Sequence, residues 1–296
     1  MQKVSIKEAL ANATRRLNDS ADTDPRRTAS LLLSHLTQKP IEKIIIQSDE
    51  TLSESLLKSY YKLIERRTRG EPLQYILGEW EFYKRKFFLN PDVFIPRPET
   101  EFIIDAAKKY IDKEESLKVL DIGAGSGAIA ITLAAEFAYS SVTAVEMSEP
   151  ALKIALKNAL SIGVADRVKF IASDSISALN PGCKFDLVVT NPPYVPEAEY
   201  GGLQKEIVCW EPIIAFLGGS DGLNFLRLLT EGGSLKNILH PPIDKFLGDK
   251  GLFITEIGWN QRDAVLKLMN RNNRLKNIDV IEDYNGIPRT LVFRKK

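Results

Sequence analysis

The chain contains few of the residues that bind metals or form disulfides. Its 296 residues include two cysteines, Cys183 and Cys209, and two histidines, His35 and His240. These four residues lie in separate segments, and no two of them have the spacing of a redox pair or of a metal site. We therefore predict no metal site, reduced thiols and a reducing compartment.

The sequence also lacks long apolar runs and an excess of charge of either sign. No run approaches the ~20 apolar residues that cross a bilayer, and the amino terminus lacks the pattern of a signal peptide. Lys and Arg total 40 against 39 Asp and Glu, which gives a formal net charge of +1. A basic face that neutralises many phosphates is therefore not expected. The sequence predicts a cytoplasmic, monomeric protein without a membrane or nucleic-acid partner.

Three helix starts punctuate the first part of the chain. Ser5, Asp24 and Ser53 are residue types that cap helices well, and each precedes apolar residues at helical spacing. Residues 1–78 are therefore predicted to form a small helical bundle. Its role is either internal packing or the docking of a partner.

The composition changes twice after this bundle. Residues 79–96 are aromatic and β-branched around Asn90-Pro91-Asp92, which predicts a linking hairpin with its turn at that tripeptide. Residues 97–296 then alternate strand-like and helical runs, which predicts an α/β domain with a parallel sheet and helices on both faces. The predicted strands are 118–122, 141–146, 168–172, 185–190, 252–257, 278–282 and 290–294. One predicted helix begins at Gly127, and three others span 149–160, 223–239 and 263–270.

A glycine-rich loop follows the first predicted strand of this domain. In the sequence VLDIGAGSGA at 119–128, the glycines allow backbone amides to approach a ligand at a helix amino terminus. Glu146 ends the next strand, 19 residues after Gly127. A carboxylate at that place can accept hydrogen bonds from both hydroxyls of a ribose. The combination predicts a nucleotide-like ligand, whereas the glycines alone would also fit a tight turn.

The same spacing fits a dinucleotide-binding fold, because Gly123, Gly125 and Ala128 satisfy the pattern G-x-G-x-x-G/A. Asp121 distinguishes the two ligands. A carboxylate directly before the loop repels a pyrophosphate but suits the amino group of a methionine moiety, which favours S-adenosylmethionine. A dinucleotide oxidoreductase and a non-catalytic cofactor-binding adaptor remain as alternatives.

The tetrapeptide Asn191-Pro192-Pro193-Tyr194 follows the predicted strand 185–190. Ligands of open α/β sheets bind at the carboxyl ends of the strands, so this loop is expected in the same crevice as the glycine loop. The prolines remove backbone donors, which leaves the loop carbonyls and the Asn191 side-chain oxygen as outward-facing acceptors. Such a site suits an NH₂ group that becomes positive as it attacks a methyl carbon. Tyr194 is expected to stack on the planar group.

An amide or an exocyclic amine is therefore the predicted target. Methylation of a nucleic-acid base amine is the main alternative, and it predicts a basic DNA-reading domain, which the near-neutral charge disfavours. A carboxamide nitrogen is a poor nucleophile, so we expect positioning to supply most of the rate gain without a general base.

Motifs outside the tetrapeptide narrow the class. The runs EPLQYILG at 71–78 and FIPRPETE at 94–101, with Glu211-Pro212 and EIGW at 256–259, strongly resemble the HemK/PrmC family of release-factor glutamine methyltransferases. The resemblance covers nearly the whole chain. It implies a helical amino-terminal domain, a hairpin linker and a seven-stranded Rossmann-like class I methyltransferase domain. It also implies S-adenosyl-L-methionine as cofactor and the glutamine of the Gly-Gly-Gln tripeptide of peptide chain release factors as substrate.

Site residues follow from the resemblance position by position. The residues implied to bind the cofactor are Asp121, Ile122, Gly123, Ala124, Gly125, Glu146, Asp174, Ser175 and Asn191, with Asp174 and Ser175 beside the adenine. The residues implied to hold the substrate amide are Asn191, Pro192, Pro193 and Tyr194. Ser175 departs from the family, in which many members carry an aromatic residue at this position.

Two further stretches are left without a role. Arg97 and Glu99 either gate the crevice or pair with each other at the surface. Residues 232–250 are longer than the family leads us to expect, and the Pro-Pro step after His240 predicts a surface loop.

Overall fold

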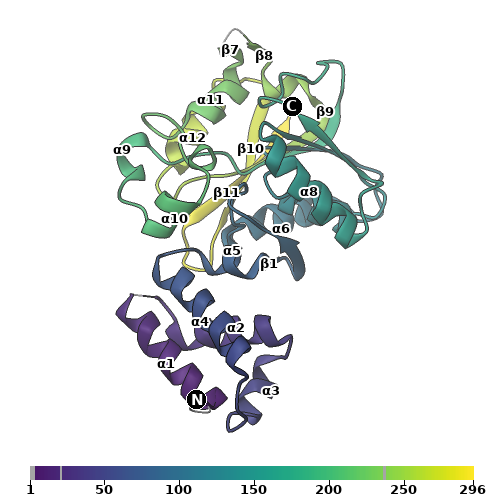
Figure 1. Ribbon diagram of the computed structural model, residues 1–296. Coiled ribbons are helices and arrows are strands. Elements are labelled where there is room, and N and C mark those ends of the chain that lie inside the picture. The colour runs from purple at the N-terminus through teal and green to yellow at the C-terminus, as the bar shows by residue number, and fades with distance from the viewer. Residues whose placement is uncertain (1–3, 21, 236–237) are drawn as a thin grey trace. The chain divides into compact units, whose positions relative to one another are not determined.

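The computed structural model describes residues 4–20, 22–235 and 238–296. The chain divides into two compact units (Figure 1). The first unit contains Met1–Glu79 and Gln204–Trp210, and the second contains Trp80–Leu203 and Glu211–Lys296. The short segment Gln204–Trp210 belongs to the helical unit, although the sequence places it far inside the predicted α/β domain.

The first unit is a bundle in which α1, α2 and α4 lie side by side (Figure 1). The predicted caps are present: Ser5 forms a capping box with Glu8, and the side chains of Asp24 and Ser53 accept backbone N–H groups of α2 and α4. Two short helices, α3 and α5, were not predicted. The helices are α1 (Ile6–Asp19), α2 (Pro25–Thr37), α3 (Ile41–Ile46), α4 (Glu54–Thr68) and α5 (Leu73–Leu77).

A buried arginine holds α10 (Lys205–Trp210) in this first unit. Arg67 is 7% exposed, and its guanidinium contacts both Asp22 and Glu206 at 2.6 Å. The same guanidinium donates to the backbone carbonyl of Glu71 at 2.9 Å. A buried guanidinium needs such partners to offset its lost hydration. These contacts explain why a segment from so far along the chain packs with the helices.

The second unit begins at Trp80, inside the hairpin of β1 (Glu79–Phe82) and β2 (Arg85–Phe88). A hairpin was expected in this region, but the predicted position of its turn was wrong. The turn is formed by Tyr83 and Lys84, whose φ angles of 48° and 61° match the left-handed conformations of a tight two-residue loop. Asn90 and Asp92 instead form a separate turn, in which the Asp92 N–H donates to the Asn90 side chain at 3.1 Å.

A seven-stranded sheet forms the core of the second unit, in the order β10-β11-β9-β6-β3-β4-β5. The pairs from β9 to β5 are parallel, whereas β11 runs antiparallel to both β9 and β10. The predicted α/β fold class is thereby confirmed. The strands are β3 (Lys118–Ile122), β4 (Ser141–Glu146), β5 (Val168–Ala172), β6 (Phe185–Thr190), β9 (Leu247–Glu256), β10 (Leu275–Glu282) and β11 (Pro288–Lys295).

Alternate residues of the central strands enter two separate hydrophobic clusters, because successive side chains point to opposite faces of a sheet. Val119 of β3 packs with residues of α6, α7 and α8, whereas Leu120 packs with residues of α11 and α12. Helices therefore cover both faces. The helices of this unit are α6 (Glu101–Tyr110), α7 (Ala128–Glu136), α8 (Glu149–Ile162), α9 (Glu197–Tyr200), α11 (Asn224–Glu231) and α12 (Arg262–Met269), with short 3-10 turns η1 (Pro98–Thr100), η2 (Ile213–Ala215) and η3 (Ile243–Lys245).

The predicted helix 223–239 was too long. The helix ends at Glu231. Gly232 adopts φ 70° and ψ −170°, angles that lie outside the helical region, so the helix cannot continue through it. The chain then forms a small antiparallel pair, β7 (Gly233–Leu235) and β8 (Ile238–His240). Residues 232–250 are also not merely a surface loop, because Ile243 and Phe246 are fully buried. None of the described helices combines the length and the apolar character that crossing a membrane requires.

Two glycines with nearly the same backbone conformation allow a direct stability test. Gly127 before α7 has φ +81°, and a Cβ there would lie 2.6 Å from Cδ1 of Ile131. Gly163 after α8 has φ +79° and an added Cβ would meet no atom within 4 Å. We expect Gly163→Ala to lower the free energy of unfolding by about 1 kcal/mol through backbone strain alone. Gly127→Ala should lower it by about 3 kcal/mol, because crowding in the core is added. Urea unfolding of both variants checks this, and equal losses would contradict it.

Candidate active site

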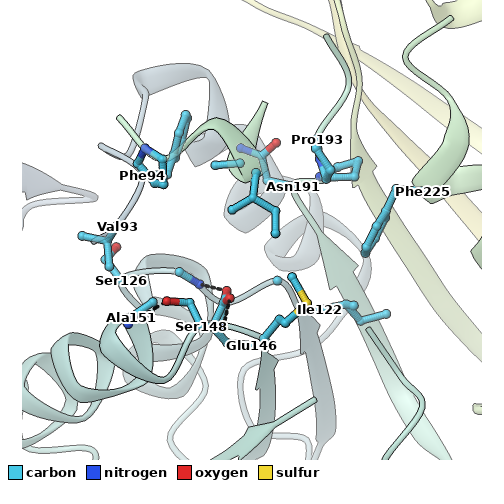
Figure 2. A pocket seen from close by; sticks show the side chains of 18 of the residues that line it. Val93, Phe94, Ile122, Ser126, Glu146, Ser148, Ala151, Asn191, Pro193 and Phe225 are labelled. Carbon is cyan, nitrogen blue, oxygen red and sulfur yellow. Dashed lines mark hydrogen bonds between the residues drawn. The ribbon is translucent and has the colours of Figure 1, made fainter. Parts of the chain in front are cut away.

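A cavity of about 450 Å³ lies at the carboxyl ends of β3, β4, β5 and β6, wholly within the second unit. Cavities of this size are typical of cofactor sites. Among the residues that sequence reasoning selected, the following line it: Ile122, Gly123, Ala124, Gly125, Glu146, Asp174, Ser175, Asn191, Pro192, Pro193 and Tyr194. Figure 2 shows Glu146 and Ser148 on one side of the cavity and Asn191 and Pro193 on the opposite side.

The glycine loop and Glu146 are joined by hydrogen bonds. Oε2 of Glu146 accepts from the Gly125 N–H at 2.9 Å, and Oε1 accepts from the Ser148 N–H at 2.8 Å (Figure 2). Each carboxylate oxygen retains a lone pair for a ligand. A Cβ built on Gly123 or Gly125 would meet no atom within 4 Å, so the loop backbone faces open space. The two sequence features thus form one wall of the cavity.

Ser175 supplies an unusual polar atom to the cavity. It is 8% exposed and has φ 53°, a conformation that non-glycine residues rarely adopt. Its Oγ has no hydrogen-bond partner among the described residues. A buried hydroxyl without a partner costs free energy, so a polar ligand atom would relieve the deficit.

Asp121 stands apart from the other selected residues, because it does not line the cavity. Its side chain is fully buried, and Oδ2 accepts from the Ala130 N–H at 3.0 Å in the first turn of α7. Burial raises the pKa of this carboxyl from 3.8 to about 7, opposed by the Ala130 N–H and assisted by the charge of Glu146. In this structure Asp121 holds the start of α7 in place and is not part of the cavity lining.

The raised pKa of Asp121 predicts a specific dependence of stability on pH. Because the pKa in the folded state, about 7, exceeds the unfolded value of 3.8, protonated Asp121 favours the folded state at low pH. That contribution is lost as the pH rises toward about 7. Relative to the unsubstituted protein, Asp121→Asn should therefore gain about 2 kcal/mol of unfolding free energy between pH 5 and pH 8. Urea unfolding at both pH values, with the exposed Asp249→Asn as control, measures it, and a pH-independent difference would refute it.

The Asn191–Tyr194 loop presents acceptors, although fewer than predicted. No hydrogen bond among the described residues uses the carbonyls of Pro192 or Pro193. The Tyr194 carbonyl, however, accepts from Nε2 of Gln261 at 2.9 Å, so the prediction that every loop carbonyl faces outward was wrong. The same Gln261 accepts the Gly258 N–H at 2.9 Å and so links two loops.

Two side chains behind the loop, Thr100 and Glu256, continue its hydrogen-bond network. Nδ2 of Asn191 donates to Oγ1 of Thr100 at 3.0 Å. That Oγ1 donates to Oε2 of Glu256 at 2.7 Å, and the Tyr194 hydroxyl donates to Oε1 of Glu256 at 3.0 Å. Burial raises the pKa of Glu256 to about 7, and burial together with the Glu256 charge raises that of Tyr194 well above its usual value.

Aromatic residues form a further wall of the cavity. Phe94 and Phe216 contact edge to face with centroids 5.4 Å apart. The guanidinium of Arg97 lies 4.9 Å from the Phe94 ring centroid and pairs with the carboxylate of Glu211. Sequence left open whether Arg97 gates the crevice or pairs with Glu99. Its observed partner is Glu211, so the pairing with Glu99 is not observed. Glu211 also accepts from the Ile95 N–H at 3.0 Å, which fixes this wall in place.

Known families match both parts of the chain. Residues 8–78 match the model of the PrmC N-terminal domain, and residues 100–210 match that of the methyltransferase small domain. A release factor glutamine methyltransferase of Koribacter versatilis is 38% identical over 99% of this chain and 99% of its own length. The chain belongs to the release factor glutamine methyltransferase family.

Two further proteins are similar to this chain. A release factor glutamine methyltransferase of Bacillus subtilis is 35% identical over 97% of this chain and 96% of its own. A solved structure, a release factor-specific protein-(glutamine-N5) methyltransferase from Alicyclobacillus acidocaldarius, is 25% identical, covers 71% of this chain and 99% of that chain, and has a TM-score of 0.40. The predicted resemblance to the HemK/PrmC family is confirmed.

Several site residues of this family member were missed by sequence reasoning. Thr100 and Glu256 lie inside the motifs that carried the family resemblance but received no role there. Glu211 lies in a third such motif. Phe225 had no comparable signal, because an apolar residue early in a helix is ordinary core material. The further cavity residues that were missed include Val93, Phe94, Pro96, Ile214, Phe216 and Leu217.

Proposed function

We propose that this chain transfers a methyl group from S-adenosyl-L-methionine to the side-chain amide nitrogen of the glutamine in the Gly-Gly-Gln motif of peptide chain release factors. The observation that carries the proposal is the acceptor loop Asn191–Tyr194 opposite the wall formed by the glycine loop and Glu146 (Figure 2). One wall suits a nucleoside, and the other suits an NH₂ group. Membership of the release factor glutamine methyltransferase family supports the same reaction.

The residues of the first wall fit this cofactor. Glu146 retains acceptor capacity for two ribose hydroxyls. The Ser175 hydroxyl, which lies next to Asp174 and has no hydrogen-bond partner in the part of the chain that the structure describes, suits a ring nitrogen of adenine. The open backbone at Gly123 and Gly125 leaves room for the methionine portion. When bound, the cofactor supplies an electrophilic methyl group on a sulfonium. Ile122 and Ala124 complete this wall.

The second wall fits a carboxamide. The Pro192 and Pro193 carbonyls and Oδ1 of Asn191 can accept hydrogen bonds from an NH₂ group, and these bonds strengthen as positive charge develops on nitrogen. Tyr194 is anchored by its hydroxyl and carbonyl, so its ring holds a fixed place in the lining. The chain thereby positions the amide and excludes water. No general base is required, because the proton can leave to water after transfer.

The proposal assigns a role to each part of the chain. Residues 1–78 help to dock the release factor, residues 79–96 link, and residues 97–296 carry out the transfer. We further propose that the protein acts as a monomer in the cytoplasm without a nucleic-acid partner. The net charge of +1 supports the last point, and the two free, exposed cysteines fit a reducing compartment.

Transfer of labelled methyl from S-adenosylmethionine tests the proposal. Purified release factor, a release-factor variant with the tripeptide glutamine changed to alanine, and adenine-rich DNA are offered in parallel. We expect label on the unsubstituted release factor alone. Label on the DNA would instead support a base-amine methyltransferase, and equal label on both release factors would exclude the tripeptide glutamine as target.

A further inference from the structure

We propose that Thr100 and Glu256 are positioning residues that fix which way the Asn191 amide faces. This inference rests on the proposed function, since it concerns how the acceptor loop is oriented toward an NH₂ group. The three side chains form one chain of hydrogen bonds, from Nδ2 of Asn191 through Oγ1 of Thr100 to the carboxylate of Glu256.

The direction of these bonds follows from the chemistry of each group. An ionised carboxylate only accepts hydrogen bonds, so the single hydroxyl hydrogen of Thr100 must point to Glu256. Oγ1 of Thr100 then has only lone pairs to offer to Asn191. The NH₂ end of the Asn191 amide must therefore face Thr100. Glu256 thus determines the orientation of this amide through Thr100.

The consequence concerns the other end of the Asn191 amide. No described residue donates a hydrogen bond to Oδ1 of Asn191. Asn191 lines the cavity, so this oxygen remains available as an acceptor for an NH₂ group of a substrate. A rotated amide would offer a donor instead, which would repel the NH₂ group. Thr100 and Glu256 thereby select the productive orientation.

Glu256 also anchors Tyr194, so one carboxylate serves both ends of the loop. Its Oε1 accepts from the Tyr194 hydroxyl while Oε2 accepts from Thr100. Glu256 is 1% exposed and Thr100 is 3% exposed, so water cannot easily replace either partner. A buried network of this kind holds one arrangement only when all members are satisfied.

Protonation of Glu256 would reverse the constraint. A protonated carboxyl can donate to Thr100, which frees the Thr100 hydrogen to point toward Asn191. Around Glu256, burial raises its pKa to about 7, the Thr100 and Tyr194 hydroxyls lower it, the Glu99 charge in η1 raises it, and Arg289 of β11 lowers it. The ionised form is the productive one. Transfer should therefore weaken as the pH falls below about 7.

Substitutions of Thr100 test the proposal kinetically. Thr100→Val keeps the shape but removes the acceptor for Nδ2 of Asn191, so we expect kcat to fall about 10-fold through loss of orientation. The Kd for S-adenosylmethionine should stay within about 2-fold, because Thr100 makes no bond to the glycine loop or Glu146. Thr100→Ser restores the hydroxyl and should restore kcat. A wild-type kcat in Thr100→Val, or a Thr100→Ser variant as slow as the valine variant, overturns the proposal.

A matched control separates orientation from general damage. Thr230 is 2% exposed. Its hydroxyl donates to the Leu226 carbonyl at 2.7 Å and lies 2.9 Å from the Met269 sulfur. Thr230→Val should leave kcat and its pH profile unchanged. Glu256→Gln should show the low kcat at every pH and lose the fall below about pH 7. A fall that persists in Glu256→Gln would assign the titration to another group, such as Asp121, and overturn this part.

A spectroscopic measurement makes the proposal independent of the methyl acceptor. The side-chain NH₂ signals of Asn191, assigned through their loss in Asn191→Asp, report directly on the bond to Thr100. We expect one of the two hydrogens to be shifted downfield at pH 8 and this shift to disappear in Thr100→Val. If the shift behaves so but release factor is not methylated, the proposed function fails and the orientation network stands. If the Asn191 NH₂ signals are the same in the unsubstituted protein and in Thr100→Val, the hydrogen-bond network is refuted whatever the substrate.

Discussion

Asn191→Ala should lower turnover by a factor on the order of 10²–10³ while leaving the affinity for S-adenosylmethionine largely intact. The substitution removes the acceptor that Thr100 and Glu256 orient, together with part of the cavity wall. Its effect falls on the transition state, because the hydrogen bond to the substrate nitrogen strengthens only as positive charge develops. Single-turnover transfer to release factor at saturating cofactor, with calorimetric binding of the cofactor in parallel, measures the two quantities.

The comparison with Pro193→Ala sharpens this prediction. That variant keeps the loop carbonyls and the Asn191 side chain, but it loosens the loop and adds one backbone N–H, so its loss of turnover should be smaller than that of Asn191→Ala. An Asn191→Ala enzyme with unchanged turnover would remove Asn191 from the reaction. Parallel losses of turnover and cofactor affinity would instead mean that the substitution damages the fold of the site.

Glu146→Gln should show the opposite pattern, with cofactor affinity lowered by a factor on the order of 10² and turnover at saturating cofactor changed little. The carboxylate accepts backbone N–H groups from both Gly125 and Ser148. A glutamine has one oxygen, so it can satisfy only one of them well. It also loses the charge that strengthens hydrogen bonds to ribose hydroxyls. Loosening of the loop and weaker sugar contacts both act on binding.

Titration calorimetry with S-adenosylmethionine checks this second prediction. Glu149→Gln is the matched control, since Glu149 is an exposed carboxylate in the first turn of α8 and lies outside the cavity lining. The control should bind the cofactor like the unsubstituted protein. Equal affinities of the two glutamine variants would remove Glu146 from the cofactor site.

The central strands and two walls of the cavity, the one with the glycine loop and Glu146 and the one with Asn191–Tyr194, could be predicted from sequence, because their signals are local. The runs 118–122, 141–146, 168–172 and 185–190 are apolar, short and bounded by loop residues, and each matches an observed strand. Ligands of an open parallel sheet bind at the carboxyl ends of its strands, so Glu146 at the end of β4 and Asn191 after β6 were placed in one cavity without any structure.

Other features failed because the deciding contacts are not local. The pairing of Thr100 with Glu256 joins residues far apart in sequence, and no periodicity reports it. The hairpin turn at Tyr83 and Lys84 lacks the Asn or Gly that usually marks such a turn. Sequence places Asp121 beside the glycine loop but could not show that its strand directs the carboxylate into the interior, where it accepts from the Ala130 N–H.

The segment after α11 failed for a related reason. Ile238 and Leu239 extend an apolar pattern that looks helical, but Gly232 ends the helix and both side chains are exposed, at 39% and 72%. Composition alone could not show that these residues pair with β7 rather than face the core.

Locating the transferred methyl group on the product tests the central claim most directly. Release factor treated with the enzyme and S-adenosylmethionine is digested, and fragmentation mass spectrometry of the tripeptide-containing peptide assigns the added methyl to an atom. We predict one methyl group on the side-chain amide nitrogen of the Gly-Gly-Gln glutamine, absent when Asn191→Ala enzyme is used for the same time. A methyl group on any other residue, or an unmodified peptide from the active unsubstituted enzyme, would contradict the account.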